Sequence, residues 1–228
     1  MKIGIPRALS YYNFYPFWLG FFSSLGIDIC LSDNTTKDTL SKGASLVVTE
    51  TCLPVKVYVG HVLNLIDKGV DKIFVPSIQS LQHKIYNCSK LRGLPDLIRN
   101  VVKKDITIID ATLDLSEDKK LYDFLTEIAQ YFNIKDQNKI KQASKQGFQM
   151  YNNFHIMRRS GIDYKTALKY AGQNRVIVPN VEKEYPINIA LISHGYNIYD
   201  DLTSMKIFSK MEKLDVKVYT AENLSMNK

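Results

Sequence analysis

Two of the three cysteines lie shortly before a proline that can begin a helix. Cys52 belongs to the string TETCLPVKVYVGHV, residues 49–62, and Cys88 to KIYNCSKLRGLPDLIRN, residues 84–100. Pro54 suits a first helical turn because it has no N–H group to leave unpaired. The free N–H groups and the dipole of a helix start favour a thiolate. Both cysteines are therefore candidates for metal ligands or nucleophiles.

The first 110 residues alternate short apolar runs with amphipathic stretches, a pattern typical of βα units on a parallel sheet. We expect helices at 11–25, 54–68 and 95–104, and strands at 2–5, 27–31, 45–48, 72–75 and 106–109. Cys52 then follows the third strand and Cys88 the loop after the fourth. Neighbouring parallel strands lie about 4.8 Å apart and end at the same edge of the sheet. Both thiols should therefore face one crevice beyond the strand ends.

Other interpretations of the cysteines stay open. Free cysteines are often small buried apolar residues, and two thiols could also form a redox or zinc site. A zinc ion or a [4Fe-4S] cluster normally takes three or four protein donors. Cys30 is expected in the core and His61 in packing or on the surface, while His83 is open between a solvated and a functional role.

The second half of the chain changes character. Apolar residues at spacings of three and four predict helices after residue 120, and a linker is expected at 174–186. A new α/β pattern follows, with strands at 187–192 and 216–219 and a helix at 202–214. We therefore predict an open parallel α/β sheet flanked by helices, then helices, then the start of a second α/β domain. The predicted bounds are a cluster-binding domain at 1–116, a helical connecting segment at 117–183 and the second domain at 184–228.

Two strands and one helix cannot cover both faces of a sheet. We therefore expect either that residues 187–219 add to the first sheet or that the natural protein continues past Lys228. The strings IGIPRALSYYN and IALISHGYNIY open the two halves similarly, which favours two domains built alike.

Four softer candidates for substrate binding follow from the same strand-end rule. Arg7 follows the first expected strand, and His194 with Tyr196 follows the first strand of the second half. Local hydrogen bonds in turns are the competing interpretation for all three. Glu50, beside Cys52, could donate or accept a proton at the cysteine site. The favoured role is a cap on the helix that begins at Pro54.

Composition narrows the function classes. The chain has 228 residues, a net charge of +7 and a pI near 9.1, but its lysines are scattered in pairs and match no nucleic-acid motif. It contains neither an apolar run long enough for a membrane span nor a signal peptide, so we expect a cytoplasmic protein. No G-x-G-x-x-G or Walker motif is present, and ATP is not expected to bind.

Several strings together resemble the iron-sulfur component of the 2-hydroxyacyl-CoA dehydratase superfamily, in its activase-associated and double-cubane-cluster branch. They are IGIPRAL, FYPFWLGFFSSLGIDICLSDNTT, VVTETCLPVKVYVGHV, KGVDKIFVPS, YNCSKLRGLPDLIR and, later, ISHGYNIYDD. The resemblance implies two α/β domains that share a [4Fe-4S] cluster, with Cys52 and Cys88 matching its first two cysteine ligands. The family's third cysteine lies late in the second domain, and no residue of this chain matches it. The string NCSK also departs from the family, which more often has proline after this cysteine.

The function implied is that of an N-terminal part of a [4Fe-4S] component that receives electrons from an ATP-hydrolysing iron-sulfur activator in an anaerobe. Such a component acts either as a lyase, the 2-hydroxyacyl-CoA dehydratase, or in a low-potential reductase. Implied partners are the activator, an acyl-CoA and a homo- or heterodimer mate, without nucleic acid or membrane. The alternative is a non-catalytic regulatory or interaction domain associated with a CoA-substrate-enzyme activase, with structural cysteines or a zinc or thiol site.

Overall fold

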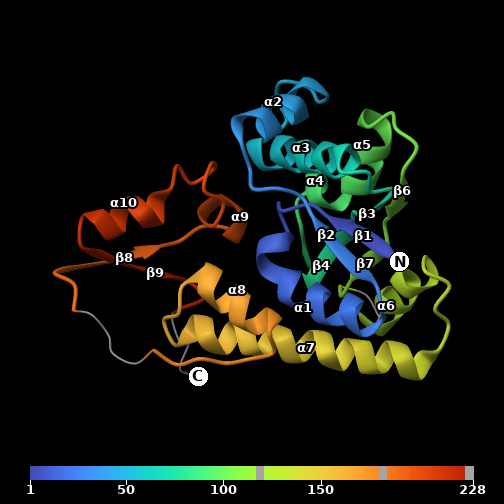
Figure 1. The fold of residues 1–228 in the computed structure, drawn as a ribbon. Helices are drawn as coiled ribbons and strands as arrows, with labels where there is room; N and C mark the ends of the chain where they lie inside the picture. The colour runs from blue at the N-terminus through green and yellow to red at the C-terminus, as the bar shows by residue number, and fades with distance from the viewer. Residues whose placement is uncertain (117–120, 180–183, 224–228) are drawn as a thin grey trace. The chain divides into compact units, whose positions relative to one another are not determined.

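The computed structural model describes residues 1–116, 121–179 and 184–223 (Figure 1). The chain forms two compact units, unit 1 from residues 1–8 and 22–144 and unit 2 from residues 9–21 and 145–228. Helices α1 (Tyr11–Ser24) and α7 (Gln137–Arg159) contribute to both units. The predicted domain bounds at 116/117 and 183/184, and part of the predicted linker, fall at residues outside the described ranges, and they stay predictions.

Unit 1 contains a parallel sheet in the order β2-β1-β3-β6, so the predicted fold class is confirmed. Its strands are β1 (Lys2–Ile5), β2 (Asp28–Leu31), β3 (Lys72–Phe74) and β6 (Thr107–Ile109). Ile3, Ile73 and Ile109 are fully buried, as expected for a parallel sheet covered on both faces. Four of the five predicted strands therefore exist within about one residue of their expected bounds.

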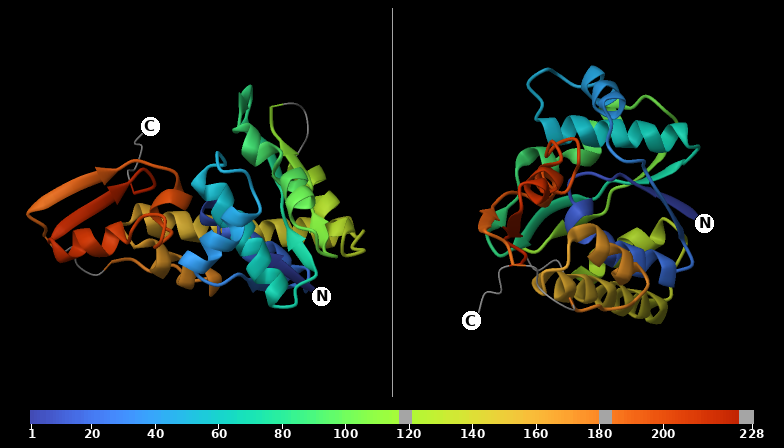
Figure 2. Two further views of the ribbon diagram at one scale, coloured as in Figure 1. Left: turned by 90° about the horizontal axis from the view of Figure 1, so that it is seen from above. Right: turned by 60° about the vertical axis from the view of Figure 1, so that its left-hand side comes forward.

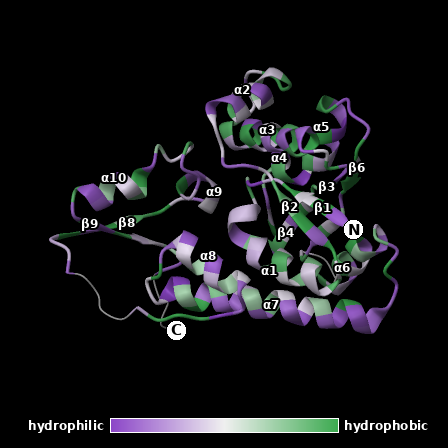
Figure 3. Ribbon diagram, in the orientation of Figure 1, coloured by the Kyte–Doolittle hydropathy of each residue, from purple (hydrophilic) through white to green (hydrophobic). Residues whose placement is uncertain are grey.

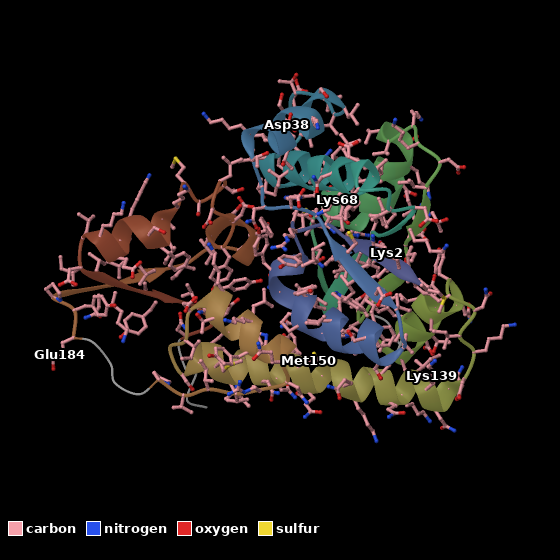
Figure 4. All side chains as sticks on the ribbon, in the orientation of Figure 1. Lys2, Asp38, Lys68, Lys139, Met150 and Glu184 are labelled. Carbon is pink, nitrogen blue, oxygen red and sulfur yellow. The ribbon has the colours of Figure 1, made fainter. Side chains whose placement is uncertain are left out.

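The predicted strand at 45–48 is wrong. The chain forms helix α2 (Lys37–Ser45) and then an irregular segment up to Cys52. The helix starts at Thr36, whose hydroxyl accepts a hydrogen bond from Thr39 N (3.1 Å) while Thr39 Oγ1 bonds Thr36 N (3.2 Å). This reciprocal capping fixes a helix start, and the exposed side chain of Val48 shows that the apolar run is not a buried strand. An exposed ion pair between Asp38 and Lys42 lies on α2 (Figure 4).

Helix α2 packs very closely on α3 (Leu53–Asp67). A Cβ atom on Gly43 would lie 1.9 Å from Lys56 O, and one on Gly60 would lie 1.9 Å from Thr39 O. Only glycine allows this backbone approach. Because α2 covers the side of α3 away from the sheet, α3 is buried nearly all round.

The crossovers place three helices on one face of the unit 1 sheet. The chain moves in the same direction from β2 to β3 and from β3 to β6, so right-handed connections put their helices on the same side. These helices are α3, α4 (Ser89–Arg92) and α5 (Leu94–Val101) (Figures 1 and 2). On the other face, Phe22 in the last turn of α1 contacts Phe74 and Phe132, near helix α6 (Leu121–Gln130).

Beyond the four-stranded sheet, two strands continue in parallel as β4 (Ser77–Gln82) and β7 (Thr112–Asp114). Hydrogen bonds from Val75 N to Ile109 O (2.9 Å) and from Ser77 N to Ala111 O (3.1 Å) bridge the junction. A two-residue strand, β5 (Ile85–Tyr86), pairs antiparallel with β4 and forms a hairpin. The sequence predicted only a loop there.

Unit 2 contains helix α8 (Tyr164–Gly172) and a two-stranded parallel sheet of β8 (Ile187–Leu191) and β9 (Val216–Thr220). Both strands were predicted from the sequence. The helix expected at 202–214 is only α10 (Ile207–Lys213), because Met205 and Lys206 adopt positive φ values of 51° and 56° that no α-helix accepts. Strand β8 is apolar yet mostly exposed (Figure 3). No helix in the described part of the chain is long and apolar enough to cross a membrane.

Candidate thiolate site

Cys52 and Cys88 are both exposed free thiols, and both occupy the residue before a helix. Their backbones are nearly identical, with φ −63° and ψ 148° at Cys52 and φ −62° and ψ 150° at Cys88. Neither side chain caps its helix. The interpretation of the two residues as buried apolar packing is therefore wrong. The predicted position of Cys52 at a helix start is confirmed, whereas Cys88, predicted in the loop before the helix at 95–104, precedes a further short helix, α4, that was not predicted.

The backbone carbonyls at the two cysteines also make the same bonds. Cys52 O accepts from Val55 N (3.1 Å) and Lys56 N (3.2 Å), and Cys88 O accepts from Leu91 N (3.0 Å) and Arg92 N (3.1 Å). Each carbonyl is thus held in the first helical turn, so the thiol is the group left to project outward. The chain builds one local motif twice.

Helix α3 carries Cys52 beyond the end of the four-stranded sheet. Tyr58, buried in this helix, donates its hydroxyl proton to Phe74 O at the end of β3 (3.1 Å), and burial raises the pKa of Tyr58. Cys52 lies six residues before Tyr58, or about 9 Å along the helix axis. The helix runs antiparallel to β3, and Ser77 lies about 10 Å beyond Phe74. Cys52 is therefore level with the start of β4.

Cys88 lies at a similar level of β4. The preceding residue, Asn87, donates from its backbone N to Gln79 O (2.8 Å) and from Nδ2 to Ile78 O (2.9 Å). At the other end of α4, Ser77 Oγ donates to Arg92 O (2.7 Å). Cys88 thus begins its helix beside the middle of β4. Both cysteines therefore belong to segments past the carboxyl end of β3, each just before a helix; we call these two segments, residues 46–53 and 79–92, the thiol rim.

The other cysteine and two of the histidines do not complete a metal site. Cys30 is half-buried in the edge strand β2 rather than in the core. His61 is 1% exposed, with Nε2 2.9 Å from Thr35 Oγ1, so its packing role is confirmed. His83 is exposed, with Nδ1 3.1 Å from Ser116 O. Within the ranges that the structure describes, no group of three or more His, Cys, Asp or Glu side chains could hold a metal ion.

Arg7 lies past the end of β1, as predicted, in a polar cluster of its own. Its backbone N donates to Ser32 Oγ (2.8 Å) and its guanidinium to Asn34 Oδ1 (3.3 Å), while its buried Nε has no hydrogen-bond partner among the described residues. Lys68, labelled in Figure 4, donates to Asp33 Oδ1 (2.7 Å), and this bond lowers the pKa of Asp33. The local hydrogen bonds of Arg7 are those of a turn residue, and its role in substrate binding stays a prediction.

The remaining predicted site residues have separate outcomes. Glu50 is exposed and does not cap α3, because Cys52 occupies the capping position; the predicted cap is wrong. In unit 2, His194 precedes helix α9 (Gly195–Ile198), and its exposed ring stacks on Tyr196 with centroids 5.0 Å apart. The binding roles of Glu50, His194 and Tyr196 stay predictions.

Unit 2 also contains a buried network that the sequence did not reveal. Arg158 is 3% exposed and donates to Ile162 O (2.6 Å), Tyr199 Oη (2.8 Å), Thr220 Oγ1 (3.2 Å) and Glu222 Oε2 (3.4 Å). Tyr199 also donates to Glu222 (2.6 Å), and burial raises the pKa of Tyr199 to about 12. The network ties α7 to the end of β9. It has no sequence signal, because its members are spread over more than sixty positions.

Residues 2–224 match the family described as "CoA enzyme activase uncharacterised domain (DUF2229)". The chain belongs to this family. The description fits the dehydratase and activase superfamily that the sequence resembles, and it does not extend to the iron-sulfur branch. No curated protein and no solved structure matches the chain.

In this CoA enzyme activase domain the thiol rim offers two soft donors. Exposed thiolates suit iron-sulfur clusters, zinc and Cu(I) better than hard oxygen-seeking cations. N–H groups at a helix start can bond to sulfur or an anionic centre, and both cysteines occupy such a start. A zinc ion or a [4Fe-4S] cluster normally takes three or four protein donors, and among the described residues no group of three or more His, Cys, Asp or Glu side chains could supply them.

Proposed function

We propose that this domain is the N-terminal part of an iron-sulfur component in a CoA-enzyme activase system, and that Cys52 and Cys88 are two ligands of a [4Fe-4S] cluster. The observation that carries this proposal is the repeated geometry of two exposed thiols, each at the residue before a helix and with nearly the same backbone angles. A purely structural domain has no need for two such thiols.

The chain's own residues would hold and shield the negative charge of such a site. Both thiols precede helices, whose first N–H groups have no partner within the helix and could bond to a bound anionic centre. Lys56 Nζ donates to Thr49 O (2.8 Å), which orders the segment before Cys52 and keeps a cation near it. A bound [4Fe-4S] cluster would supply one-electron transfer at low potential. The domain would receive the electron from an ATP-hydrolysing activator and serve either dehydration of a 2-hydroxyacyl-CoA or a reduction.

The test is anaerobic reconstitution of the full-length polypeptide with iron and sulfide. We expect iron and sulfide to be incorporated together with visible absorbance, and Cys52→Ser or Cys88→Ser to abolish both. Cys30→Ser is the matched control, because Cys30 lies within strand β2 and not at a helix start, and it should load like the parent. Circular dichroism of each variant separates loss of ligands from loss of fold.

A second candidate follows from the lack of a third donor among the described residues. On this candidate the rim is a zinc or thiol site in a non-catalytic interaction domain. Stoichiometric zinc without visible absorbance, lost in the Cys52→Ser/Cys88→Ser double variant, would favour it over the cluster. A folded protein that binds neither metal would contradict both metal proposals.

A further inference from the structure

The hairpin that leads into Cys88 exposes an unusual amount of apolar surface. We call residues 77–92, which comprise β4, β5 and α4, the hairpin arm. Leu81, Ile85 and Tyr86 are 41%, 61% and 52% exposed and lie within six consecutive residues of this arm. Single exposed apolar side chains are ordinary, whereas three in so short a segment favour an interaction surface.

The charge of the hairpin arm has one sign. Residues 76–95 include Lys84, Lys90 and Arg92 as well as His83, but no aspartate or glutamate. Among the described residues, none of the three cations forms an ion pair within 4 Å. Asp114 on β7 is paired in register with Ser80 of the arm, and its carboxylate accepts from Ser116 N (2.9 Å) and Ser116 Oγ (2.5 Å).

The hairpin arm is also held in shape before any partner arrives. Arg92 Nε donates to Gln79 Oε1 (2.6 Å), and its guanidinium lies 5.2 Å from the centre of the Tyr86 ring. Ser80 Oγ lies 2.5 Å from Ile85 O, which fixes β5 against β4. An arginine stacked on a tyrosine beside exposed aliphatic residues is the composition that dominates protein interfaces. Such preorganisation lowers the entropy lost on binding.

We infer that the hairpin arm is a docking surface for a protein partner that presents carboxylates around an apolar patch. The positive charge of the arm favours an acidic partner. The exposed Leu81, Ile85 and Tyr86 favour a protein over a nucleic acid, because surfaces that bind nucleic acids carry basic residues at higher density. Because Cys88 lies within the arm, between β5 and α4, a partner docked on the arm is held beside this thiol. That electrons pass between them rests on the proposed function; the docking does not.

The probe is a short synthetic peptide in which glutamate alternates with valine and phenylalanine, and its control has lysine in place of glutamate. Binding is measured by calorimetry to the full chain carrying Cys52→Ser and Cys88→Ser, so that the result is independent of any metal. We expect the acidic peptide to bind and its affinity to fall as salt rises, because screening shortens the range of exposed charges. Lys84→Glu/Lys90→Glu and Ile85→Ser/Tyr86→Ser should each weaken binding about tenfold.

Lys103→Glu/Lys104→Glu is the matched control, since these exposed lysines follow α5 outside the arm. It should change the affinity less than about twofold. The inference is overturned if the lysine peptide binds equally well, if the control variant weakens binding as much as the arm variants, or if an oligonucleotide or an anionic vesicle binds the arm more tightly. If the acidic peptide does not bind but iron loads normally, only the docking surface is rejected. If the peptide binds but iron does not load, only the cluster is rejected.

Discussion

Replacement of Gly60 by alanine should separate α2 from α3 and destabilise unit 1. The added Cβ would lie 1.9 Å from Thr39 O and 2.8 Å from Thr39 C, both backbone atoms that cannot rotate away. An ordinary van der Waals contact begins near 3.4 Å, so helix α2, which carries Thr39, must move away from α3 by about 1.5 Å. Overpacking of this kind costs about 3 kcal/mol, and the better helix propensity of alanine offsets about 1 kcal/mol.

The expected net loss is therefore about 2 kcal/mol, or a fall in melting temperature of about 4–8 °C. Hydrogen exchange in α2 and α3 is the appropriate local assay, because the single tryptophan, Trp18, lies in unit 2. Gly93→Ala is the matched control: its φ is −91°, its nearest contact is Ser89 O at 3.4 Å, and its effect should stay within about 0.5 kcal/mol. A Gly60→Ala protein with unchanged exchange and melting would refute the close-packing argument.

Two further predictions concern unit 2, where Trp18 fluorescence reports unfolding in urea. Arg158→Met should lower the free energy of unfolding by about 3 kcal/mol, because it leaves Glu222 without its cation and Tyr199 without a donor; an unchanged urea midpoint would contradict the network. Burial lowers the pKa of His155 in the folded protein below 6.5. As the pH falls, the imidazole is therefore protonated in the unfolded chain before it is protonated in the folded one. The free energy of unfolding then decreases between pH 6.5 and the pKa of the folded state. His155→Phe should flatten that part of the stability curve measured between neutral and mildly acidic pH, and equal slopes in the two proteins would exclude the histidine as its cause.

The apolar runs identified most of the unit 1 sheet because a buried parallel strand must be apolar throughout. The same rule failed at residues 45–48, where Val48 is exposed, because a short apolar run does not say what covers it. The signal that decides this segment is the capping pair Thr36 and Thr39, which begins a helix. A glycine in each of two helices, Gly43 and Gly60, then allows the helices to pack without a gap.

The prediction that Cys52 lies at a helix start survives the missing strand. Pro54 fixes the start of α3 whatever precedes it, so Cys52 lies at a helix start although no strand ends there. That the next crossover brings Cys88 to the same edge as Cys52 stays a prediction. The hairpin arm was missed because β5 has only two residues, too few for an alternating pattern, and is defined by its pairing with β4. Arg158 was missed because its partners are distant in sequence.

Among the residues that the structure describes, the thiol rim has too few donors for a metal site, and the hairpin arm exposes apolar side chains. Both features favour contact with a second molecular surface. Two thiolates alone leave at least one coordination position of a tetrahedral or cluster site to another donor. Three exposed apolar side chains beside one of those thiolates make contact with a second surface favourable. A partner surface that covers the arm would also exclude water from the thiol rim. The lower local dielectric would then strengthen the electrostatic attraction between the helix starts and a charged centre. If Cys52 and Cys88 bind a metal as proposed, the affinity for that metal should therefore depend on what covers the arm.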